Sequence, residues 1–188
     1  MKIYTKRGDD GCTFLPDGSI MPKNAPVLCL CGSLDELNSY LGLVYSALGD
    51  NTNFDRDISF INYLQNMLFS IGAEIILAGK RDEQIDYEYL TYKLEKEIDS
   101  IQDNLPELKN FILPRGNLAV SFCHIARCHA RKVERNLINV IQENTKYSLV
   151  AKNYSKCLNR LSDYLFVLSR KIVYGYNLDE TLWIKSKA

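Results

Sequence analysis

Apolar residues recur along the chain at every third or fourth position, which is the spacing of one face of an α-helix. The clearest example covers 118–145, with the apolar positions Ala119, Phe122, Ala126, Ala130, Val133, Leu137 and Val140 or Ile141. The same pattern predicts helices over 33–48, 55–78, 86–104 and 149–174. No run of alternating apolar and polar residues, as in a half-buried β-strand, competes with it. The pattern therefore predicts an all-α protein.

Glycine and proline divide the chain into a loop-rich front and a helical remainder. The first 32 residues contain Gly8, Gly11, Pro16, Gly18, Pro22, Pro26 and Gly32. Neither residue type occurs between Asn117 and Tyr174. A capping box, with Ser33 as N-cap and Glu36 three residues later, predicts that the first helix begins at Ser33.

Four or five long helices joined by short connections pack best as an antiparallel bundle. The chain contains no repeats or low-complexity tracts, so we expect one domain over 1–188. Within it we expect an N-terminal loop region over 1–32, a helical bundle over 33–176 and a C-terminal tail over 177–188.

Composition and charge exclude several classes of protein. The chain has 188 residues, 46% of them hydrophobic, and 23 basic side chains balance 23 acidic ones. A net charge of zero argues against a protein that coats nucleic acid or an anionic membrane. No run of 18 or more apolar residues predicts a membrane span. We therefore expect a cytoplasmic protein without nucleic-acid or membrane partners.

The six cysteines and two histidines offer no metal site. Because there is no C-x-x-C motif and no signal sequence follows Met1, we expect mostly reduced, packed thiols, with disulfides as the alternative. His124 and His129 point about 140° apart on a helix and could not share one metal ion. The absence of an E-x-x-H pair excludes a di-iron carboxylate bundle.

The first candidate for chemistry is the segment Thr5-Lys6-Arg7-Gly8-Asp9-Asp10-Gly11-Cys12-Thr13. Its two glycines allow backbone N–H groups to turn toward an anion, and the neighbouring basic and hydroxyl side chains add donors. The spacing is not that of a Walker A loop. Taken alone, the segment is more simply interpreted as an ordinary polar turn.

The second candidate is a polar stripe on the helix predicted over 118–145: His124, Arg127, Arg131, Glu134 and Arg135. Its three arginines recur every fourth residue and share a face, where like charges repel by about 0.2–0.5 kcal/mol per pair. The planar fork of arginine suits carboxylate and phosphate groups. Residues 115–135 thus form a basic island that the net charge conceals. The alternative is a solvent-facing or interface stripe.

Three further features have both a structural and a functional interpretation. Asn159 and Asp163 share a helix face, as a surface or satisfied polar pair or as part of a site. Asp35 either complements a helix dipole or forms an ion pair with a residue such as Arg127. The apolar loop FILPRG (111–116) is either a hydrophobic staple for the next helix or an aromatic lid over a flat ligand.

Together these segments resemble the cobalamin adenosyltransferases of the PduO type, which are ATP:cob(I)alamin transferases. The matching motifs are KIYTKRGDDG (2–11), CGSLDELNSYLG (31–42), LFSIGAEI (68–75), FILPRG (111–116), HIARCHARKVER (124–135) and LNRLSDYLFVLSR (158–170). The resemblance implies a five-helix bundle of ferritin-like architecture, with a four-helix up-and-down core plus an extra helix. It also implies a homotrimer with active sites between neighbouring subunits.

The resemblance assigns roles to individual residues. The implied loop positions that wrap ATP are Thr5, Lys6, Arg7, Gly8, Thr13 and Lys23. The implied nucleotide-binding positions on the last two helices are Arg131, Lys132, Val133, Glu134, Arg135 and Asn159. Asp35 and Arg127 correspond to an ion pair across the subunit interface near the corrin, and Phe111 to an aromatic that crowds the lower corrin face. These three and Arg131 are the implied catalytic residues, and no metal ligands are implied.

The implied reaction transfers the 5′-deoxyadenosyl group of ATP to cobalt. Cob(I)alamin attacks C5′ and expels triphosphate, so no general base is needed. The basic island, facing the basic N-terminal loop, would stabilise the departing polyanion together with Mg²⁺. The expected ligands are ATP with Mg²⁺ and cobalamin, and a reductase or an adenosylcobalamin-dependent acceptor enzyme is the protein partner to consider. The alternative function is a non-catalytic carrier or sensor of ATP or adenosylcobalamin.

The chain departs from the family pattern at four positions. Arg115 stands where glycine is usual in the loop motif, and Lys132 replaces an arginine, which loses the bidentate fork. Cys31 replaces a common aromatic and Ser33 replaces threonine. None of these changes removes a residue assigned to the chemistry.

Overall fold

The structure is a computed structural model that describes residues 4, 6, 8–80 and 85–185. The described helices are α1 (Pro26–Leu48), α2 (Asp55–Ile76), α3 (Tyr87–Gln102), α4 (Leu118–Gln142), α5 (Lys146–Asn153) and α6 (Ser155–Gly175). A 3₁₀ turn, η1 (Thr52–Phe54), precedes α2, and the strands β1 (Cys12–Phe14) and β2 (Ile20–Pro22) precede α1. The predicted helical fold is confirmed, with α5 as a short sixth helix.

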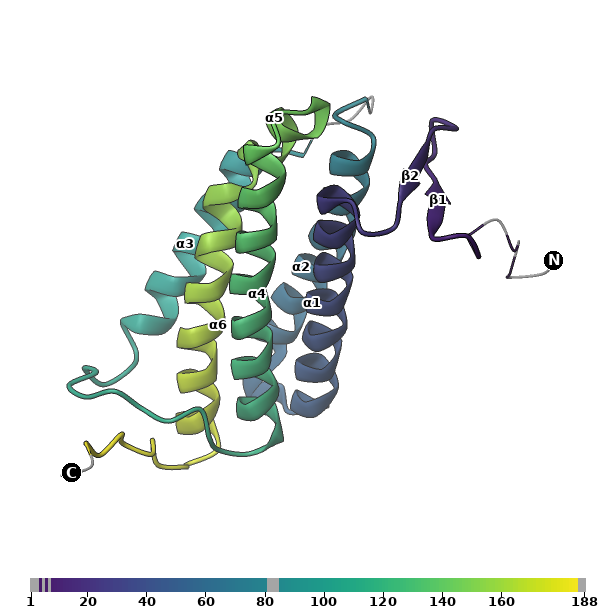
Figure 1. Cartoon of the computed structure of the whole chain (residues 1–188). Helices are drawn as coiled ribbons and strands as arrows, with labels where there is room; N and C mark the ends of the chain where they lie inside the picture. Colours follow the sequence, from purple (N-terminus) through teal and green to yellow (C-terminus); the bar gives the residue numbers. More distant parts are fainter. Residues whose placement is uncertain (1–3, 5, 7, 81–84, 186–188) are drawn as a thin grey trace.

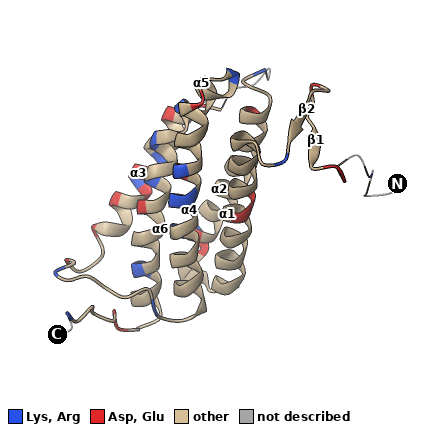
Figure 2. Ribbon diagram, in the orientation of Figure 1, with Lys and Arg blue, Asp and Glu red and all other residues tan. Residues whose placement is uncertain are grey.

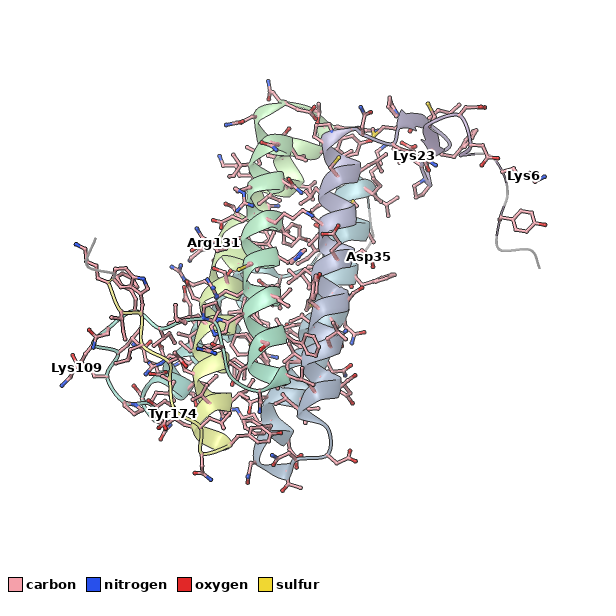
Figure 3. The ribbon with its side chains drawn as sticks, turned by 60° about the horizontal axis from the view of Figure 1, so that its bottom comes forward. Lys6, Lys23, Asp35, Lys109, Arg131 and Tyr174 are labelled. Atoms are coloured by element: carbon pink, nitrogen blue, oxygen red, sulfur yellow. The ribbon has the colours of Figure 1, made fainter. Side chains whose placement is uncertain are left out.

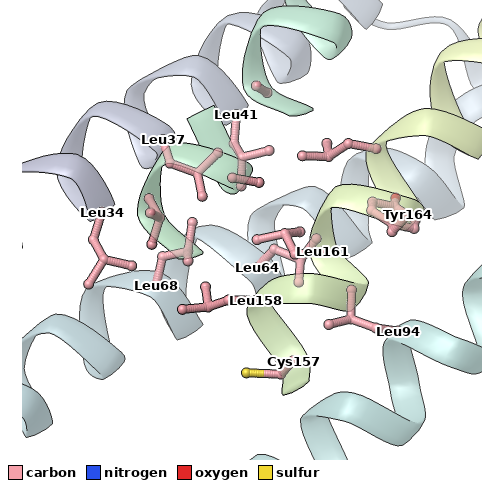
Figure 4. Close-up of a cluster of buried hydrophobic side chains, with 14 of the residues drawn as sticks. Leu34, Leu37, Leu41, Leu64, Leu68, Leu94, Cys157, Leu158, Leu161 and Tyr164 are labelled. Carbon is pink, nitrogen blue, oxygen red and sulfur yellow. The ribbon is translucent and has the colours of Figure 1, made fainter. Parts of the chain in front are cut away.

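The five long helices pack side by side as a bundle (Figure 1). Helix α4 packs against both α1 and α6, α2 packs against α1, and α3 packs against α6. Their facing stripes form one hydrophobic core, in which Leu37, Leu41 and Leu64 are buried (Figure 4). Burial of apolar surface stabilises such a core by about 25 cal/mol per Å². Side chains on the outer faces of α4 and α6 are therefore carried by a well-packed scaffold.

Helix α1 begins at Pro26 rather than at Ser33. Ala25 is the N-cap, and proline at N1 suits a position whose N–H has no partner within the helix. Ser33 is buried inside the helix, and its hydroxyl donates to Leu30 O at 2.8 Å. The prediction that Ser33 caps the helix is wrong, because Pro26 starts it without a side-chain cap. Asp35 consequently lies well inside α1 rather than in its first turn.

The last helix, predicted over 149–174, is divided in the structure into α5 and α6. The Thr145 side chain accepts from Tyr147 N, and the Ser148 hydroxyl accepts from Thr145 N at 2.8 Å, which forms a capping box at the start of α5. Tyr154 separates α5 from α6. No glycine or proline marks this break, so apolar spacing alone could not reveal it.

The strands β1 and β2 form an antiparallel hairpin with Thr13 opposite Met21. Gly18 in the connecting turn has a φ of 81°, which side chains rarely adopt. The hairpin lies beyond the N-terminal end of α1 (Figure 1), and the side chain of Leu15 in its turn is buried against the core. It was not predicted, because strands of three residues are too short to show alternation.

Helix α1 is long and apolar enough, by length and composition alone, to cross a membrane. The core helix of a soluble protein passes the same test, so this single helix is weak evidence for a span. Because its buried side packs against α2 and α4, we interpret α1 as a helix of the bundle.

Candidate active site

A cavity of about 810 Å³ lies between α3, α4, α6 and the connection that follows α3. Four arginines line this arginine cavity: Arg127, Arg131, Arg160 and Arg170. Charged positions gather on α3, α4 and α6 on this side of the bundle (Figure 2). The predicted stripe therefore contributes Arg127 and Arg131 to the cavity, while Arg135 is exposed and does not line it.

Glu134 on α4 and Asn159 on α6 are in direct contact. Asn159 Nδ2 donates to Glu134 Oε1 at 3.0 Å, and Arg160 Nη1 donates to Asn159 Oδ1 at 3.0 Å. Arg160 Nε donates in turn to Glu95 Oε1 on α3 at 2.9 Å. The structure thus brings together two predicted nucleotide-binding positions. Arg160, which was not predicted as a site residue, orients the amide of Asn159.

The cations of the arginine cavity differ in their partners. Arg160 and Arg170 each pair with a carboxylate of the same chain. Within residues 8–80 and 85–185, no ion pair engages Arg127 or Arg131. Arg127 Nε is buried and has no hydrogen-bond partner among the described residues. Two such guanidinium groups suit an anionic ligand or a carboxylate from another chain.

His124 is buried and is not part of an exposed stripe, so this prediction is wrong. It lies one turn after the fully buried Val120, and its exposed fraction is 6%. Burial, together with the nearby charge of Arg127, lowers the pKa of the His124 imidazole to about 4. The ring is therefore neutral near pH 7.

Lys132 and Val133 do not reach the arginine cavity. Lys132 Nζ lies 2.6 Å from Glu36 Oε2 on α1, and His129 Nδ1 lies 3.3 Å from the same oxygen. The hydrogen bond from Lys132 is the main cause that lowers the pKa of the Glu36 carboxyl. Val133 is fully buried in the core. Within one chain, these two predicted nucleotide positions join helices rather than line the cavity.

The glycine-rich loop before β1 folds around Lys23. The Lys23 backbone N–H donates to Gly11 O at 2.9 Å. Lys23 Nζ lies so close to Gly8 that a Cβ added to this glycine would be 3.1 Å away from it. Lys6 and Lys23 are exposed, and Thr13 is half-buried. The structure therefore brings the predicted lysine and the predicted glycine together.

The loop and the arginine cavity lie on different sides of one chain. Figure 3 shows Lys6 and Lys23 beyond the N-terminal end of α1, whereas Arg131 lies on α4 toward α6. The expectation that the basic helix faces the basic loop is therefore wrong within a single chain. The predicted residues Thr5 and Arg7 lie outside the described residues.

Asp35 and Arg127 border different cavities. Asp35 lines a mainly apolar hollow of about 410 Å³ between α1 and α2, which we call the apolar hollow. Phe69 lines the same hollow and is 74% exposed. Arg127 lines the arginine cavity, so the implied ion pair of the two residues is not formed within the chain.

Phe111 is presented to solvent on the connection between α3 and α4. The side chain is 79% exposed, and its ring meets that of Trp183 edge to face, with 6.3 Å between the centroids. Ile112 and Leu182 form an isolated antiparallel bridge. The C-terminal tail therefore lies along the predicted lid loop, a contact that the sequence motifs did not indicate. Arg115 is exposed near the end of the same loop.

The described residues contain no group of three or more His, Cys, Asp or Glu side chains that could hold a metal ion. The six cysteines are free thiols, with Cys123 and Cys157 buried. Burial raises the pKa of the Cys31 thiol to about 11 and that of Cys157 to about 12. These thiols are therefore protonated and unreactive near neutral pH.

Comparison with known proteins identifies the family. The family model described as cobalamin adenosyltransferase matches residues 3–172. The corrinoid adenosyltransferase of Bacillus subtilis is 35% identical over 173 residues, which cover 92% of this chain and 86% of that protein. The human corrinoid adenosyltransferase MMAB is 31% identical over 192 residues, which cover 98% of this chain and 74% of that protein. The chain therefore belongs to the cobalamin adenosyltransferase family.

Solved structures agree in fold. A variant of the PduO-type ATP:corrinoid adenosyltransferase from Lactobacillus reuteri, complexed with cobalamin and ATP, matches with a TM-score of 0.89 and 30% identity. The match covers 98% of this chain and 100% of that chain. Another variant of that enzyme, complexed with ATP, matches with a TM-score of 0.82 and 31% identity. Within the family, the chain thus belongs to the PduO-type ATP:corrinoid adenosyltransferases. The resemblance inferred from the motifs is confirmed.

Proposed function

We propose that the protein transfers the 5′-deoxyadenosyl group of ATP to the cobalt of cob(I)alamin in a single displacement. Family membership gives the activity as ATP-dependent corrinoid adenosylation with adenosylcobalamin as product. In the proposed step, the electron pair of Co(I) forms the Co–C5′ bond, the C5′–O bond breaks, and triphosphate leaves with its electron pair. The nucleophile carries no proton, so the site needs alignment and charge stabilisation rather than a general base.

The observation that carries this proposal is the difference between the arginines of one cavity. Arg160 is held by an ion pair, whereas no ion pair of the described chain engages Arg127 or Arg131. Guanidinium groups without an internal counter-ion can bind a triphosphate, whose negative charge grows at the leaving oxygen. Asn159, oriented by Glu134 and Arg160, adds a polar group of fixed direction for the nucleoside.

The ATP site, in this proposal, lies between two copies of the chain. Lys6 and Lys23 project beyond α1, whereas Arg131 and Asn159 lie on α4 and α6, so one chain presents the two halves on different sides. Contact between two different faces of identical subunits is heterologous and can close into a ring. A ring of three copies, the homotrimer implied by the resemblance, would join the hairpin of one copy to the arginine cavity of the next.

Asp35 and Arg127 support the same assembly. Arg127 Nε is buried without a partner in the described chain, and the Asp35 carboxylate is exposed beside the apolar hollow. Leaving a buried donor unpaired costs about 1–3 kcal/mol. The carboxylate of Asp35 from an adjacent copy would remove this cost and bring the apolar hollow next to the arginine cavity.

The exposed ring of Phe111 serves the corrin in this proposal. An apolar ring against the lower corrin face excludes an axial ligand from cobalt. Co(II) without that ligand is more easily reduced to Co(I), which is the attacking nucleophile. Phe111 therefore acts on the reduction that precedes the transfer, while the arginines act on the transfer itself.

Mg²⁺ enters, in this proposal, as part of the MgATP substrate. Proteins commonly hold Mg²⁺ through substrate phosphates and water with only one or two carboxylates. A site of that kind is compatible with the described acidic residues, none of which belongs to a three-ligand group. We also keep two further predictions from the sequence. One is a cytoplasmic location, and the other is a protein partner that reduces Co(II) or accepts adenosylcobalamin.

An anaerobic assay tests the proposed reaction. Purified protein, MgATP and chemically reduced cobalamin should give the absorbance spectrum of adenosylcobalamin, with release of intact triphosphate. Tight binding of ATP or adenosylcobalamin without conversion would instead identify a carrier or sensor. Pyrophosphate and phosphate in the first turnover, in place of triphosphate, would contradict a single displacement.

A further inference from the structure

Two segments outside the helices hold each other near the C-terminal end of α6 (Figure 1). One is the loop that carries Phe111, and the other is residues 177–185, which we call the C-terminal strap. Leu113 N donates to Thr181 O, and Trp183 N donates to Phe111 O, each at 2.8 Å. The edge-to-face contact of the Phe111 and Trp183 rings lies beside these two bonds.

These contacts are open to solvent. Phe111 is 79% exposed, Trp183 is 50% exposed and Ile184 is 84% exposed. A hydrogen bond that competes with water contributes little net stability, and an isolated two-stranded pairing is at best marginally stable. The loop and the strap therefore need an attachment to the bundle.

Leu178 packs against the core at the start of the strap, and Arg170 on α6 provides the attachment that also reaches the loop. Its exposed fraction is only 4%, and its Nε donates to Glu180 Oε1 in the strap at 2.5 Å. Its Nη2 donates to Pro106 O at 2.8 Å, in the connection that leads to Phe111. One buried guanidinium thus fixes both segments to the same helix. Such charge-assisted hydrogen bonds are about twice as strong as neutral ones.

We propose that Arg170 and Glu180 form a positioning pair that sets the place of the Phe111 ring by holding the strap on which its loop rests. The inference rests on the proposed role of Phe111 against the corrin and adds residues that neither the motifs nor the reaction assigned. Arg170 borders the arginine cavity, but its charge is already matched by Glu180. We therefore expect the Arg170–Glu180 pair to affect the reduction of bound cobalamin and not the binding of ATP.

The only tryptophan of the chain is Trp183, so intrinsic fluorescence reports on the strap. Glu180→Ala should lower the ratio of docked to free strap by roughly tenfold or more, because it removes a charge-assisted bond. Acrylamide quenching of Trp183 should increase, while the helical circular dichroism stays unchanged. Glu180→Gln keeps an acceptor and should give an intermediate effect. The matched control is Asp179→Ala, because Asp179 is the neighbouring acid of the same strap and is exposed.

Kinetics then separate positioning from general damage. Starting from cob(II)alamin and a reductant, Glu180→Ala should lower the rate by roughly tenfold. With cob(I)alamin supplied already reduced, the rate and the KM for ATP should stay within about twofold of wild type. Phe111→Ala should also lower the rate from cob(II)alamin, and the double variant should lose little more than either single variant, since both act through one ring.

Three results would overturn the proposal. Unchanged quenching in Glu180→Ala would show that the pair does not hold the strap. A freed strap with an unchanged rate from cob(II)alamin would show that the strap does not set the Phe111 ring. An equal loss for both cobalamin forms and for ATP would indicate general damage. If the wild-type protein forms no adenosylcobalamin, the proposed reaction fails, whereas the quenching experiment still decides whether Arg170 and Glu180 hold the strap.

Discussion

The arginine cavity and the N-terminal hairpin present positive charge in two different ways. Arg131 stands on α4, whose opposite face is packed into the core, and the neighbouring Asn159 is oriented by a hydrogen-bond network. Lys23 stands on a hairpin that projects from the bundle, and an ion pair of 3.3 Å between Asp17 and Lys146 links this hairpin to α5. The first surface is built on packed helices, and the second on a short hairpin that is held by this ion pair and by the buried side chain of Leu15.

This difference indicates a division of tasks within the proposed ATP site. A group that stabilises a transition state must be held in the productive geometry before the reaction. A group that only adds attraction for a polyanion can be held less strictly. We therefore infer that the helical face controls the rate of transfer, while the hairpin controls the affinity for ATP.

The largest expected effect is at Arg131. Arg131→Ala should lower kcat by about 10²–10³, because one preorganised charge opposite the leaving triphosphate is lost. The matched control is Arg56→Ala, since Arg56 is an exposed arginine paired with Glu97 away from the cavity, and it should keep near-full activity. Steady-state kinetics with cob(I)alamin measure both variants. Near-full activity of Arg131→Ala would contradict the inference that the helical face, which carries Arg131, controls the rate of transfer.

The next effect concerns the stability of the helical face as pH changes. The folded-state pKa of His124, about 4, lies below its ordinary value of 6.5. The unfolded chain therefore binds the proton first, so the stability contributed by neutral His124 is fully present above pH 6.5 and lost as pH falls toward 4. Between pH 7 and pH 5, the free energy of unfolding should fall by about 2 kcal/mol more in wild type than in His124→Gln.

Urea denaturation at the two pH values measures this difference. The comparison with His124→Gln is needed because other groups also titrate, and burial raises the pKa of the Asp57 carboxyl, which has the opposite effect on stability. Parallel losses in the two proteins would contradict the assignment of this pH dependence to His124.

A smaller effect is expected at Lys23. Lys23→Ala should raise the KM for ATP by roughly tenfold, the value of one charge-assisted contact, and leave kcat within about threefold. Added salt should reduce the difference between the variant and wild type, because the lysine is exposed. Lys152→Ala, at an exposed lysine on α5, serves as the control. A fall in kcat at constant KM would reverse the inferred division of tasks.

The smallest effect compares thiols on the hairpin and in the bundle. Cys12 on β1 is half-buried, whereas Cys123 and Cys157 are buried and have raised thiol pKa values. Iodoacetamide should therefore label Cys12 and leave the two buried thiols unmodified. MgATP should slow labelling of Cys12 by about threefold or more if the hairpin contacts the nucleotide. Peptide mass spectrometry measures this, and equal rates with and without MgATP would exclude such contact.

The sequence predicts the fold as far as local periodicity and local signals allow. Helix α4 is predicted well because its apolar stripe is regular over the whole of its length. The start of α1 was misplaced because a plausible capping box at Ser33 competes with proline at N1, and only packing decides between them. The break at Tyr154 and the short hairpin have no clear periodic signal.

The sequence predicts which residues belong to the candidate site but not how they are arranged in space. The arginine spacing on α4 places Arg127 and Arg131 on one face, which helix geometry alone determines. Their lack of ion pairs among the described residues, and the contacts of Arg170 with Pro106 and Glu180, depend on how the segments pack in three dimensions, which one sequence does not reveal. An arginine among the apolar positions of α6 is the one local signal that could have identified Arg170.

The most direct test asks whether the two halves of the ATP site belong to different copies of the chain. Two inactive parents are needed: Arg131→Ala, and a hairpin variant that combines Lys6→Ala with Lys23→Ala and is assayed at low ATP. When the two are co-expressed in equal amounts and purified as mixed trimers, about a third of the sites should pair an intact hairpin with an intact cavity. We predict recovery of about a third of the wild-type rate in the mixed trimers. A rate no higher than the average of the two parents would show that each site is formed within a single chain.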